Sequence, residues 1–437
     1  MNLGFLKSKE SKNALWMIGG RVVQMLFSLF VGIFTARFLG PSNYGLISYG
    51  GALTSFFMSF CTLGINSVII KDFFDNPDEQ GEAIGSSILL RVLSSICSAI
   101  LIVSISFVLD YGDWTTVVVV ALCSISLVFH CLDTLKYWFQ YQYRSKVTAI
   151  VIFCAHLATS IYKIVLLILQ KDVFWFAFAT SVDYIVFGVL LLIIYKKSGG
   201  PKLSFSWRKG KQLLSQSYHY ILSGMMVAIY GQTDKLMLKQ MLDEASVGYY
   251  STATQLCSMW TFVLTAIIDA MYPTIIQSFK QSKEEFDRKN RQLYAIVFYV
   301  TVFVSVMFLL LGDFAIWLLY GEEFMPAANP LKIVTWYTAF SYFGVARSAW
   351  MVCTNNQRYL KYMYIFAAIA NVGMNAVLIP LWGASGAALA SLITQVLTSL
   401  VLPYCIKDLR PNAKLMLEAI FLKGVFTKPV KNDGSTE

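Results

Sequence analysis

Five charged side chains lie deep inside long apolar stretches of this 437-residue chain: Arg21, Arg91, Lys163, Asp183 and Arg347. Charges at such positions are costly in hydrocarbon, and they normally face the interior of a helix bundle or water. Arg21 lies eight residues beyond Asn13, which is about 12 Å along a helix and too deep for an anchor at the membrane surface. The deep charges are therefore the first candidates for a functional role.

Three of these charges, Arg21, Arg91 and Lys163, and also Asp234 belong to polar stripes, in which residues at helical spacing share one helix face. The stripes are Arg21, Gln24, Ser28 and Thr35; Ser87, Arg91, Ser94 and Ser98; His156, Ser160 and Lys163; and His219, Ser223, Tyr230 and Asp234. Serines alone also act as hydrogen-bonding contacts between membrane helices. Because packing does not need a deep arginine, the stripes that contain a cation predict a shared wet cavity.

Other polar residues have a structural alternative. Lys163 lies seven residues before Gln170, so its long side chain also has the reach to extend to the membrane surface. Asp234 and Lys235 are adjacent, and pairing with other groups is as good an interpretation as a functional role. A purely structural role is favoured for two further sets: Asp133, Lys136, Asp269 and Lys332 near helix ends, and Asn371, Asn375 and the small residues from Gly383 to Ser391 as close-packing surfaces.

An excess of deep cations over anions favours an anionic cargo, and arginine matches phosphate through bidentate hydrogen bonds. Each net negative charge that moves out of a negative cytoplasm gains about 2.3 kcal/mol per 100 mV. The membrane potential can thus contribute to export without ATP.

The elements that position these residues are membrane helices. The chain is 57% hydrophobic and 14% charged, with a mean hydropathy of +0.60, whereas soluble domains carry roughly 25% charged residues. Twelve apolar runs are long enough to cross a bilayer as helices: 14–36, 44–64, 84–109, 114–135, 148–169, 173–195, 217–238, 247–272, 293–319, 331–353, 360–381 and 384–406. The predicted fold is all-α and integral to the membrane.

Lysine and arginine concentrate in every second connecting segment, for example 7–12, 196–211 and 280–291. Such segments mark the cytoplasmic side, which places both termini there. The net charge of +10 is therefore explained by the orientation of the chain in the membrane. It does not indicate nucleic-acid binding. The first apolar run follows Lys7, Lys9 and Lys12 but lacks a cleavage site, so it is expected to remain as a helix.

The polar segment 196–216 divides the chain into two lobes of six helices, 1–195 and 217–406, followed by a cytoplasmic tail, 407–437. Shifting the chain by 203 residues aligns "FLGPSNYGLIS" (38–48) with "MLDEASVGYYS" (241–251), each after the first helix of its lobe. This predicts parallel repeats related by a pseudo-twofold axis normal to the membrane, with a central cationic cavity. The tail contains one weakly amphipathic stretch, 413–426, which either lies on the membrane or frays.

Motifs of nucleotide hydrolysis and metal catalysis are absent from the sequence. No phosphate-binding loop and no H-E-x-x-H motif occur, and the eight cysteines form no C-x-x-C pair and read as small core residues. The loops predicted on the outer side of the membrane are short, so they leave no domain that could hold an active site. We therefore expect no catalytic residue, no metal and no cofactor.

Five segments resemble the bacterial O-antigen and polysaccharide flippases of the multidrug/oligosaccharidyl-lipid/polysaccharide exporter superfamily. They are "TARFLGPSNYGLISYG" (35–50), "LGINSVIIKDF" (63–73), "YGQTDKLMLKQMLDEASVGYYSTATQL" (230–256), "MYPTI" (271–275) and "NAVLIPLWGASGAALASLITQ" (375–395). The resemblance spans the chain from residue 13 to about 406, in consistent order.

The resemblance implies alternating access around a cation-lined cavity. The implied cargo is an undecaprenyl-diphosphate-linked oligosaccharide, moved from the inner to the outer leaflet of the cytoplasmic membrane, with H+ or Na+ as the coupling ion. Arg21, Gln24, Arg91, Lys163 and Arg347 are then candidates for cargo binding, and Asp183 and Asp234 for ion coupling. A polysaccharide polymerase and a chain-length regulator are the expected protein partners.

Three alternatives stay open at this point. A multidrug exporter of similar architecture should favour acidic and aromatic groups, and a peptidoglycan-precursor flippase commonly carries two extra helices. A membrane polymerase or glycosyltransferase usually has a sizeable outer loop. On the flippase interpretation, Arg21→Ala and Arg91→Ala are each expected to impair surface polysaccharide without reducing protein abundance.

Overall fold

The computed structural model describes residues 9–426, and side chains within 27–221 and 224–426. Each of the twelve predicted runs falls in helical segments, and no strand occurs in this part of the chain. Seven helical segments among the described residues are long and apolar enough to cross a membrane; the one from Gln357 to Cys405 contains two predicted runs. The prediction of an all-helical, multi-pass membrane protein is confirmed.

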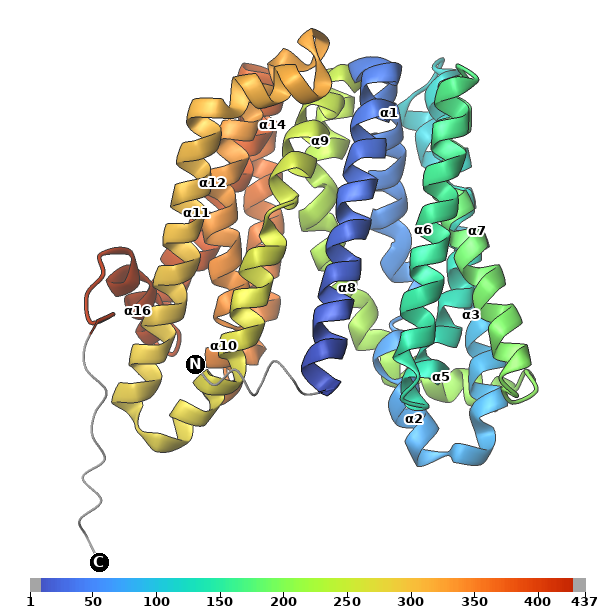
Figure 1. Cartoon of the computed structure of the whole chain (residues 1–437), viewed down its shortest axis with the longest axis horizontal. Helices are drawn as coiled ribbons and strands as arrows, with labels where there is room; N and C mark the ends of the chain where they lie inside the picture. The colour runs from blue at the N-terminus through green and yellow to red at the C-terminus, as the bar shows by residue number, and fades with distance from the viewer. Residues whose placement is uncertain (1–8, 427–437) are drawn as a thin grey trace, which may run out of the picture. The chain divides into compact units, whose positions relative to one another are not determined.

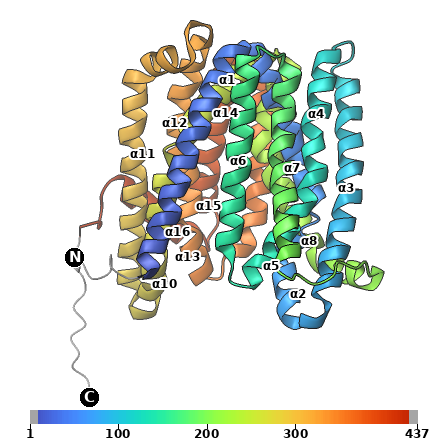
Figure 2. The same ribbon diagram turned by 45° about the vertical axis from the view of Figure 1, so that its right-hand side comes forward.

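The chain forms two compact units, Met1–Ala228 and Ile229–Glu437, here called the N-terminal and C-terminal units. The predicted linker 196–216 belongs with the N-terminal unit, because the division falls inside a helix that begins at Trp207. In the N-terminal unit the helices are α1 Lys9–Thr62, α2 Ile69–Asp75, α3 Gln80–Leu109, α4 Trp114–His130, α5 Leu135–Tyr141, α6 Ser145–Ile168, α7 Val173–Lys197 and the first part of α8 Trp207–Met241 (Figures 1 and 2).

The C-terminal unit contains the end of α8 and eight further helices. They are α9 Glu244–Ser258, α10 Thr261–Gln281, α11 Lys283–Tyr320, α12 Ala328–Ala346, α13 Ser348–Cys353, α14 Leu360–Val396, α15 Leu402–Cys405 and α16 Arg410–Ile420. The predicted run 247–272 is divided between α9 and α10. The hydrophobic core of the C-terminal unit includes Tyr294, Phe343 and Met416, which come from α11, α12 and α16.

Glycines break the long helices where the sequence predicts turns. Inside α1, Gly40 has φ 71° and precedes Pro41, a left-handed conformation that glycine adopts without steric cost. Inside α14, Gly383 has φ 57° and follows Pro380. The predicted junctions between 36 and 44 and between 381 and 384 are therefore confirmed.

The second copy of the predicted repeat uses a helix cap instead of a glycine. The Asp243 carboxylate Oδ1 accepts a hydrogen bond from the Ser246 amide at 2.7 Å and caps α9. The break between α8 and α9 thus follows the first helix of the second copy, as the alignment of 38–48 with 241–251 expects.

The eight cysteines, all of which the structure describes, form no disulfide. The expectation that they are core residues is wrong for three of them: Cys97, Cys154 and Cys405 are exposed. Exposure to hydrocarbon costs little for a small apolar thiol. Cys61, Cys123, Cys131 and Cys257 are buried.

A buried ion cluster holds the start of α8 in the N-terminal unit. The Lys209 ammonium Nζ lies 2.9 Å from Asp72 Oδ1 and 2.8 Å from Glu79 Oε2, and its side chain has no exposed surface. Lys209 precedes the predicted crossing 217–238. Burial alone would lower the pKa of its ammonium, but the hydrogen bonds to Glu79 and Asp72 outweigh burial and raise the pKa. The linker is therefore fixed to α2 and to the segment that joins α2 to α3.

Replacing Lys209 is expected to release this linker. Lys209→Met leaves Asp72 buried without its cation, and breaking a buried ion pair costs about 3–5 kcal/mol. Trypsin should then cleave at Lys196, Lys197 and Lys202 faster than in the wild-type protein, as measured by gel analysis of timed digests. Lys211→Met, at an exposed position on the same helix, is the control, and equal cleavage of both variants would contradict the role of the cluster.

The amphipathic stretch predicted in the tail packs against protein. Helix α16 lies against α11 (Figure 1), with the Asn412 amide donating to the Tyr294 hydroxyl at 2.6 Å. Arg291 pairs with Glu418 at 2.8 Å, and the Tyr299 hydroxyl donates to the Ile420 carbonyl at 2.8 Å. The tail up to residue 426 is therefore part of the C-terminal unit.

Candidate functional site

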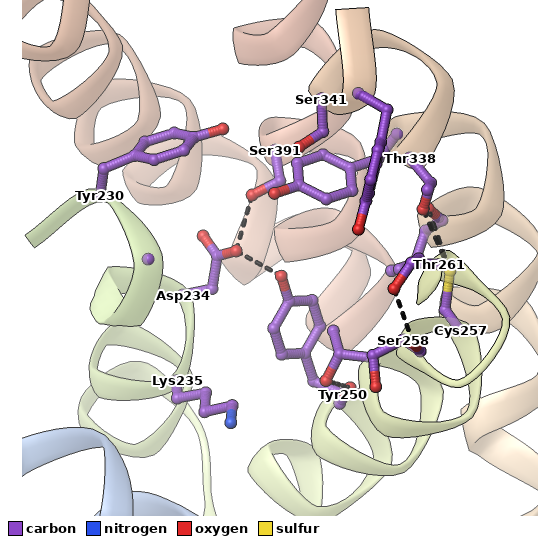
Figure 3. A pocket seen from close by; sticks show the side chains of 15 residues that line it. Tyr230, Asp234, Lys235, Tyr250, Cys257, Ser258, Thr261, Thr338, Ser341 and Ser391 are labelled. Carbon is purple, nitrogen blue, oxygen red and sulfur yellow. Dashed lines mark hydrogen bonds between the residues drawn. The ribbon is translucent and has the colours of Figure 1, made fainter. Parts of the chain in front are cut away.

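The C-terminal unit contains a cavity of about 320 Å³, within the range typical of small-molecule sites. Residues of α8, α9, α10, α12 and α14 line it, and Figure 3 shows the side chains. Its polar lining consists of Tyr230, Asp234, Lys235, Tyr250, Thr254, Ser258, Thr261, Tyr337, Thr338, Ser341, Tyr342 and Ser391. Hydroxyl groups predominate in this lining, although the surrounding helices are apolar.

The Asp234 carboxylate lies at one wall of the cavity and is only 6% exposed. Its Oδ1 accepts hydrogen bonds from Asn375 Nδ2 at 2.7 Å and Asn371 Nδ2 at 3.2 Å. Its Oδ2 accepts from Ser391 Oγ at 2.6 Å and from the Tyr250 hydroxyl (Figure 3). Four donors from α9 and α14 thus satisfy one buried carboxylate of α8.

The break at Gly383 builds this arrangement. Asn371 and Asn375 precede the break and share one face of α14, whereas Ser391 follows it. The Asn371 amide also donates to Ser391 Oγ at 3.1 Å. A Cβ at Gly386 would lie 2.0 Å from the Leu378 carbonyl oxygen, so only glycine permits the close approach of the two arms. The predicted close-packing role of this small-residue run is confirmed.

Aromatic hydroxyls extend the polar wall beyond Asp234. Gln395 Nε2 donates to the Tyr230 hydroxyl, and Tyr337 and Tyr342 of α12 also line the cavity. On the opposite side, Cys257 Sγ lies 3.1 Å from Thr338 Oγ1. Aromatic faces with hydroxyl edges suit a ligand that has both apolar ring surfaces and hydroxyl groups, such as a sugar.

The structure places Arg347 away from the residues lining this cavity. Its side chain is 5% exposed at the end of α12, and one guanidinium nitrogen donates to the Thr398 carbonyl at 3.4 Å. Its Nε and Nη1 have no hydrogen-bond partner among the described residues. Such unpaired donors are costly in the interior.

Arg91 is enclosed within the N-terminal unit and has no exposed surface. Its Nη1 donates to Thr134 Oγ1 at 2.6 Å and to Asn66 Oδ1 at 3.3 Å. Its Nη2 lies 2.9 Å from His130 Nδ1 and donates to the His130 carbonyl at 3.2 Å. In this conformation Arg91 joins α3, α4 and the turn Cys131–Thr134, and it faces protein and not a wet cavity. Its predicted role in cargo binding stays a prediction.

Asp183 of α7 faces the polar stripe of α6. Its Oδ1 lies 2.9 Å from His156 Nδ1 and accepts from Thr159 Oγ1 at 3.2 Å. Lys163 lies two turns beyond His156 on the same helix and is partly exposed. The structure thus brings one residue of this predicted stripe, His156, into contact with the predicted coupling carboxylate.

Two predicted cargo-binding residues, Arg21 and Gln24, lie on α1 at positions whose side chains are outside the described residues. Three of the four charges assigned to helix ends form ion pairs: Lys136 pairs with Asp133 at 2.7 Å, and Lys332 pairs with Asp313 at 2.7 Å. A structural role suits both lysines.

Sequence reasoning missed the partners of Asp234. It assigned Asn371 and Asn375 to packing, and it did not single out Tyr250 or Ser391. The available signal was the spacing of the two asparagines, since two buried amides on one helix face need polar partners from another helix. Among residues 9–426 no cluster of three His, Cys, Asp or Glu side chains is placed to hold a metal ion.

The sequence is similar to those of known polysaccharide biosynthesis proteins and flippases. A model of the family described as "Polysaccharide biosynthesis protein" matches residues 11–279. The capsular polysaccharide biosynthesis protein CapF of Staphylococcus aureus is 21% identical over 395 residues, which covers 88% of this chain and 96% of CapF. The lipid II flippase MurJ of Bacillus subtilis (strain 168) is 22% identical, with 95% of this chain and 89% of MurJ covered.

Solved structures share the fold. An inward closed conformation of lipid II flippase MurJ superimposes with a TM-score of 0.72 at 15% identity, covering 95% of this chain and 94% of that one. An inward-facing conformation of a multidrug resistance transporter of the MATE family and MOP superfamily superimposes with a TM-score of 0.67 at 14% identity. This match covers 90% of this chain and 95% of the transporter. The fold is therefore that of MurJ and the MATE transporters.

Proposed function

Because the chain belongs to the polysaccharide biosynthesis protein family, we propose that it flips lipid-linked oligosaccharides across a membrane. The cargo is an undecaprenyl-diphosphate-linked repeat unit of O-antigen or a similar surface polysaccharide. It moves by alternating access from the inner to the outer leaflet of the bacterial cytoplasmic membrane, with both termini of the protein in the cytoplasm. The protein acts as a transporter and not as an enzyme.

One observation carries this proposal: the cavity beside Asp234 is lined by hydroxyls and tyrosines, although membrane-spanning helices surround it. A site for a hydrophobic drug needs mostly apolar walls with few polar groups. Hydroxyl donors and acceptors match the hydroxyls of a glycan. The family match and the similarity to CapF support the same class of cargo.

Asp234 is the proposed ion-coupling residue. Ser391 and Tyr250 donate to it through hydroxyls, which can rotate and become acceptors when a proton or Na+ arrives. Neutralisation of the carboxylate then changes the bonds among α8, α9 and α14, and this change couples the ion to a conformational step. Asp183, with His156 and Thr159, is a second proposed coupling site in the N-terminal unit.

Arg21, Gln24, Lys163 and Arg347 are the proposed contacts to diphosphate or acidic sugar, and Arg91 would join them only in a conformation that exposes it. The unpaired Nε and Nη1 of Arg347 support its assignment. A polymerase and a chain-length regulator of the same polysaccharide are the proposed partners.

A second candidate cargo is a peptidoglycan precursor, because the chain is similar to the lipid II flippase MurJ in sequence and fold. A multidrug exporter is less well supported, since the charged and hydroxyl-rich cavity does not match an apolar drug. The alternative from another class of protein is an enzyme, a membrane polysaccharide polymerase or glycosyltransferase.

Deletion of the gene tests the proposal. We expect completed lipid-linked repeat units to accumulate on the inner leaflet, as measured by their protection from an external glycan-labelling reagent in intact cells. The plasmid-borne wild-type gene should restore labelling. Single units on the outer leaflet would indicate a polymerase, and accumulated lipid II would indicate the peptidoglycan precursor as cargo.

A further inference from the structure

Lys235 is a lysine of α8 that lines the cavity of the C-terminal unit beside Asp234 (Figure 3). Its side chain is partly exposed, and its Nζ has no hydrogen bond and no ion pair among the described residues. An ammonium in a membrane helix is costly unless an anion or water compensates it. The cavity is therefore the place where the charge of Lys235 is compensated.

Asp234 attracts the Lys235 ammonium through space but forms no ion pair or hydrogen bond with it. Its two oxygens accept from Asn371, Asn375, Ser391 and Tyr250. Consecutive residues of a helix point about 100° apart, so Lys235 leaves the backbone in another direction, as Figure 3 shows. Two other lysines of the C-terminal unit, neither of which lines the cavity, have carboxylate partners: Lys239 pairs with Glu244, and Lys332 pairs with Asp313.

We infer that Lys235 binds an anionic group of the cargo, either a phosphate or a sugar carboxylate, while the tyrosines and hydroxyls of the cavity hold the adjoining sugar ring. This inference rests on the proposed function and adds a residue and a ligand class to it. The ammonium provides up to three donors to an oxyanion. Tyr230, Tyr250 and Tyr337 provide ring faces, and Thr254, Ser258 and Ser341 provide hydroxyls.

The volume limits what the cavity holds. At about 320 Å³, it lies near the lower end of small-molecule sites, roughly 300–1,000 Å³. It therefore accommodates the charged group and the sugar next to it, and not a whole repeat unit with its lipid chain.

The position of Lys235 next to Asp234 also links anion and cation binding. An anion held by Lys235 approaches the Asp234 carboxylate and is repelled by it. A cation or proton bound at Asp234 removes this repulsion, and by reciprocity the anion then strengthens cation binding. Anion and coupling ion are therefore expected to bind together.

The test is calorimetric titration of the full-length protein in lipid nanodiscs with three soluble probes. These are inorganic pyrophosphate, methyl glucuronide and the uncharged methyl glucoside. We expect Lys235→Gln to weaken binding of the preferred anion by about tenfold or more, because it removes a charge-assisted hydrogen bond. Lys235→Arg should keep binding, and Asp234→Asn should strengthen it by about threefold or more.

The matched control is Lys239→Gln, one turn further along α8 and paired with Glu244, which should leave anion binding unchanged. Preference for pyrophosphate identifies the diphosphate as the bound group, and preference for the glucuronide identifies an acidic sugar. Equal binding by wild type and Lys235→Gln overturns the inference, as does failure of the wild type to bind either anion.

The two proposals fail separately. If Lys235→Gln keeps anion binding while the deletion strain accumulates repeat units inside, only the role of Lys235 is wrong. If Lys235→Gln loses anion binding while the deletion strain still displays its repeat units outside, the anion site stands and the flippase proposal is wrong.

Discussion

Asp234→Asn is expected to abolish the response of transport to an ion gradient while leaving the protein folded. The amide is close in size to the carboxylate and can retain hydrogen bonds to Ser391 and Tyr250, but it cannot carry the negative charge. One elementary charge across 100 mV is worth about 2.3 kcal/mol. Its loss should reduce the gradient-driven ratio of cargo between the leaflets by roughly 40-fold.

Proteoliposomes loaded with a fluorescent lipid-linked oligosaccharide provide the measurement, with leaflet occupancy followed by chemical quenching under an imposed H+ or Na+ gradient. Asp313→Asn is the control, because this carboxylate lies in the same unit but is 58% exposed and paired with Lys332. A wild-type response in the Asp234→Asn protein would refute ion coupling at this site.

Arg91→Ala is expected to destabilise the N-terminal unit by about 3 kcal/mol or more. The substitution removes a fully buried side chain and leaves the His130 carbonyl and Asn66 amide oxygen without their donor, and each buried unsatisfied group costs about 1–3 kcal/mol. It also leaves a void among α3, α4 and the turn Cys131–Thr134. The melting temperature and the amount of protein in the membrane should both fall.

This outcome replaces the expectation from sequence that protein abundance stays intact. Thermal unfolding of the purified protein in detergent gives the measurement, with Arg37→Ala at an exposed position of α1 as the matched control. Arg91→Lys should be intermediate, because lysine keeps the charge but not the planar fork of donors. Unchanged stability together with lost polysaccharide would instead support a direct contact of Arg91 with cargo.

The positions of the helices could be predicted because hydrocarbon allows few solutions. Every backbone polar group in the bilayer must be paired within its own segment, so each apolar run of about 20 residues becomes a helix. The breaks at Gly40 and Gly383 were also predictable, since Gly40 directly precedes Pro41 and Gly383 follows Pro380 by three residues, each near the end of such a run. Local sequence is sufficient for both.

The sequence also showed that charges such as Arg91 and Asp183 lie too deep to be ordinary surface residues, because the cost of a charge in hydrocarbon rises with its depth. It left the role of Asp234 open between pairing and function. It could not show what each charge faces. The structure places Arg91 among His130, Thr134 and Asn66, and it places Asp234 beside a cavity.

Only the tertiary structure decided that Asn371 and Asn375, which were predicted to be packing residues, bind the Asp234 carboxylate. It also placed Lys235 in the lining of the cavity, with no hydrogen bond or ion pair to any residue that the structure describes. Helical spacing fixes which residues share a face of one helix, but not which face of another helix lies opposite. That choice depends on the break in α14 and on contacts between segments more than 100 residues apart in the chain.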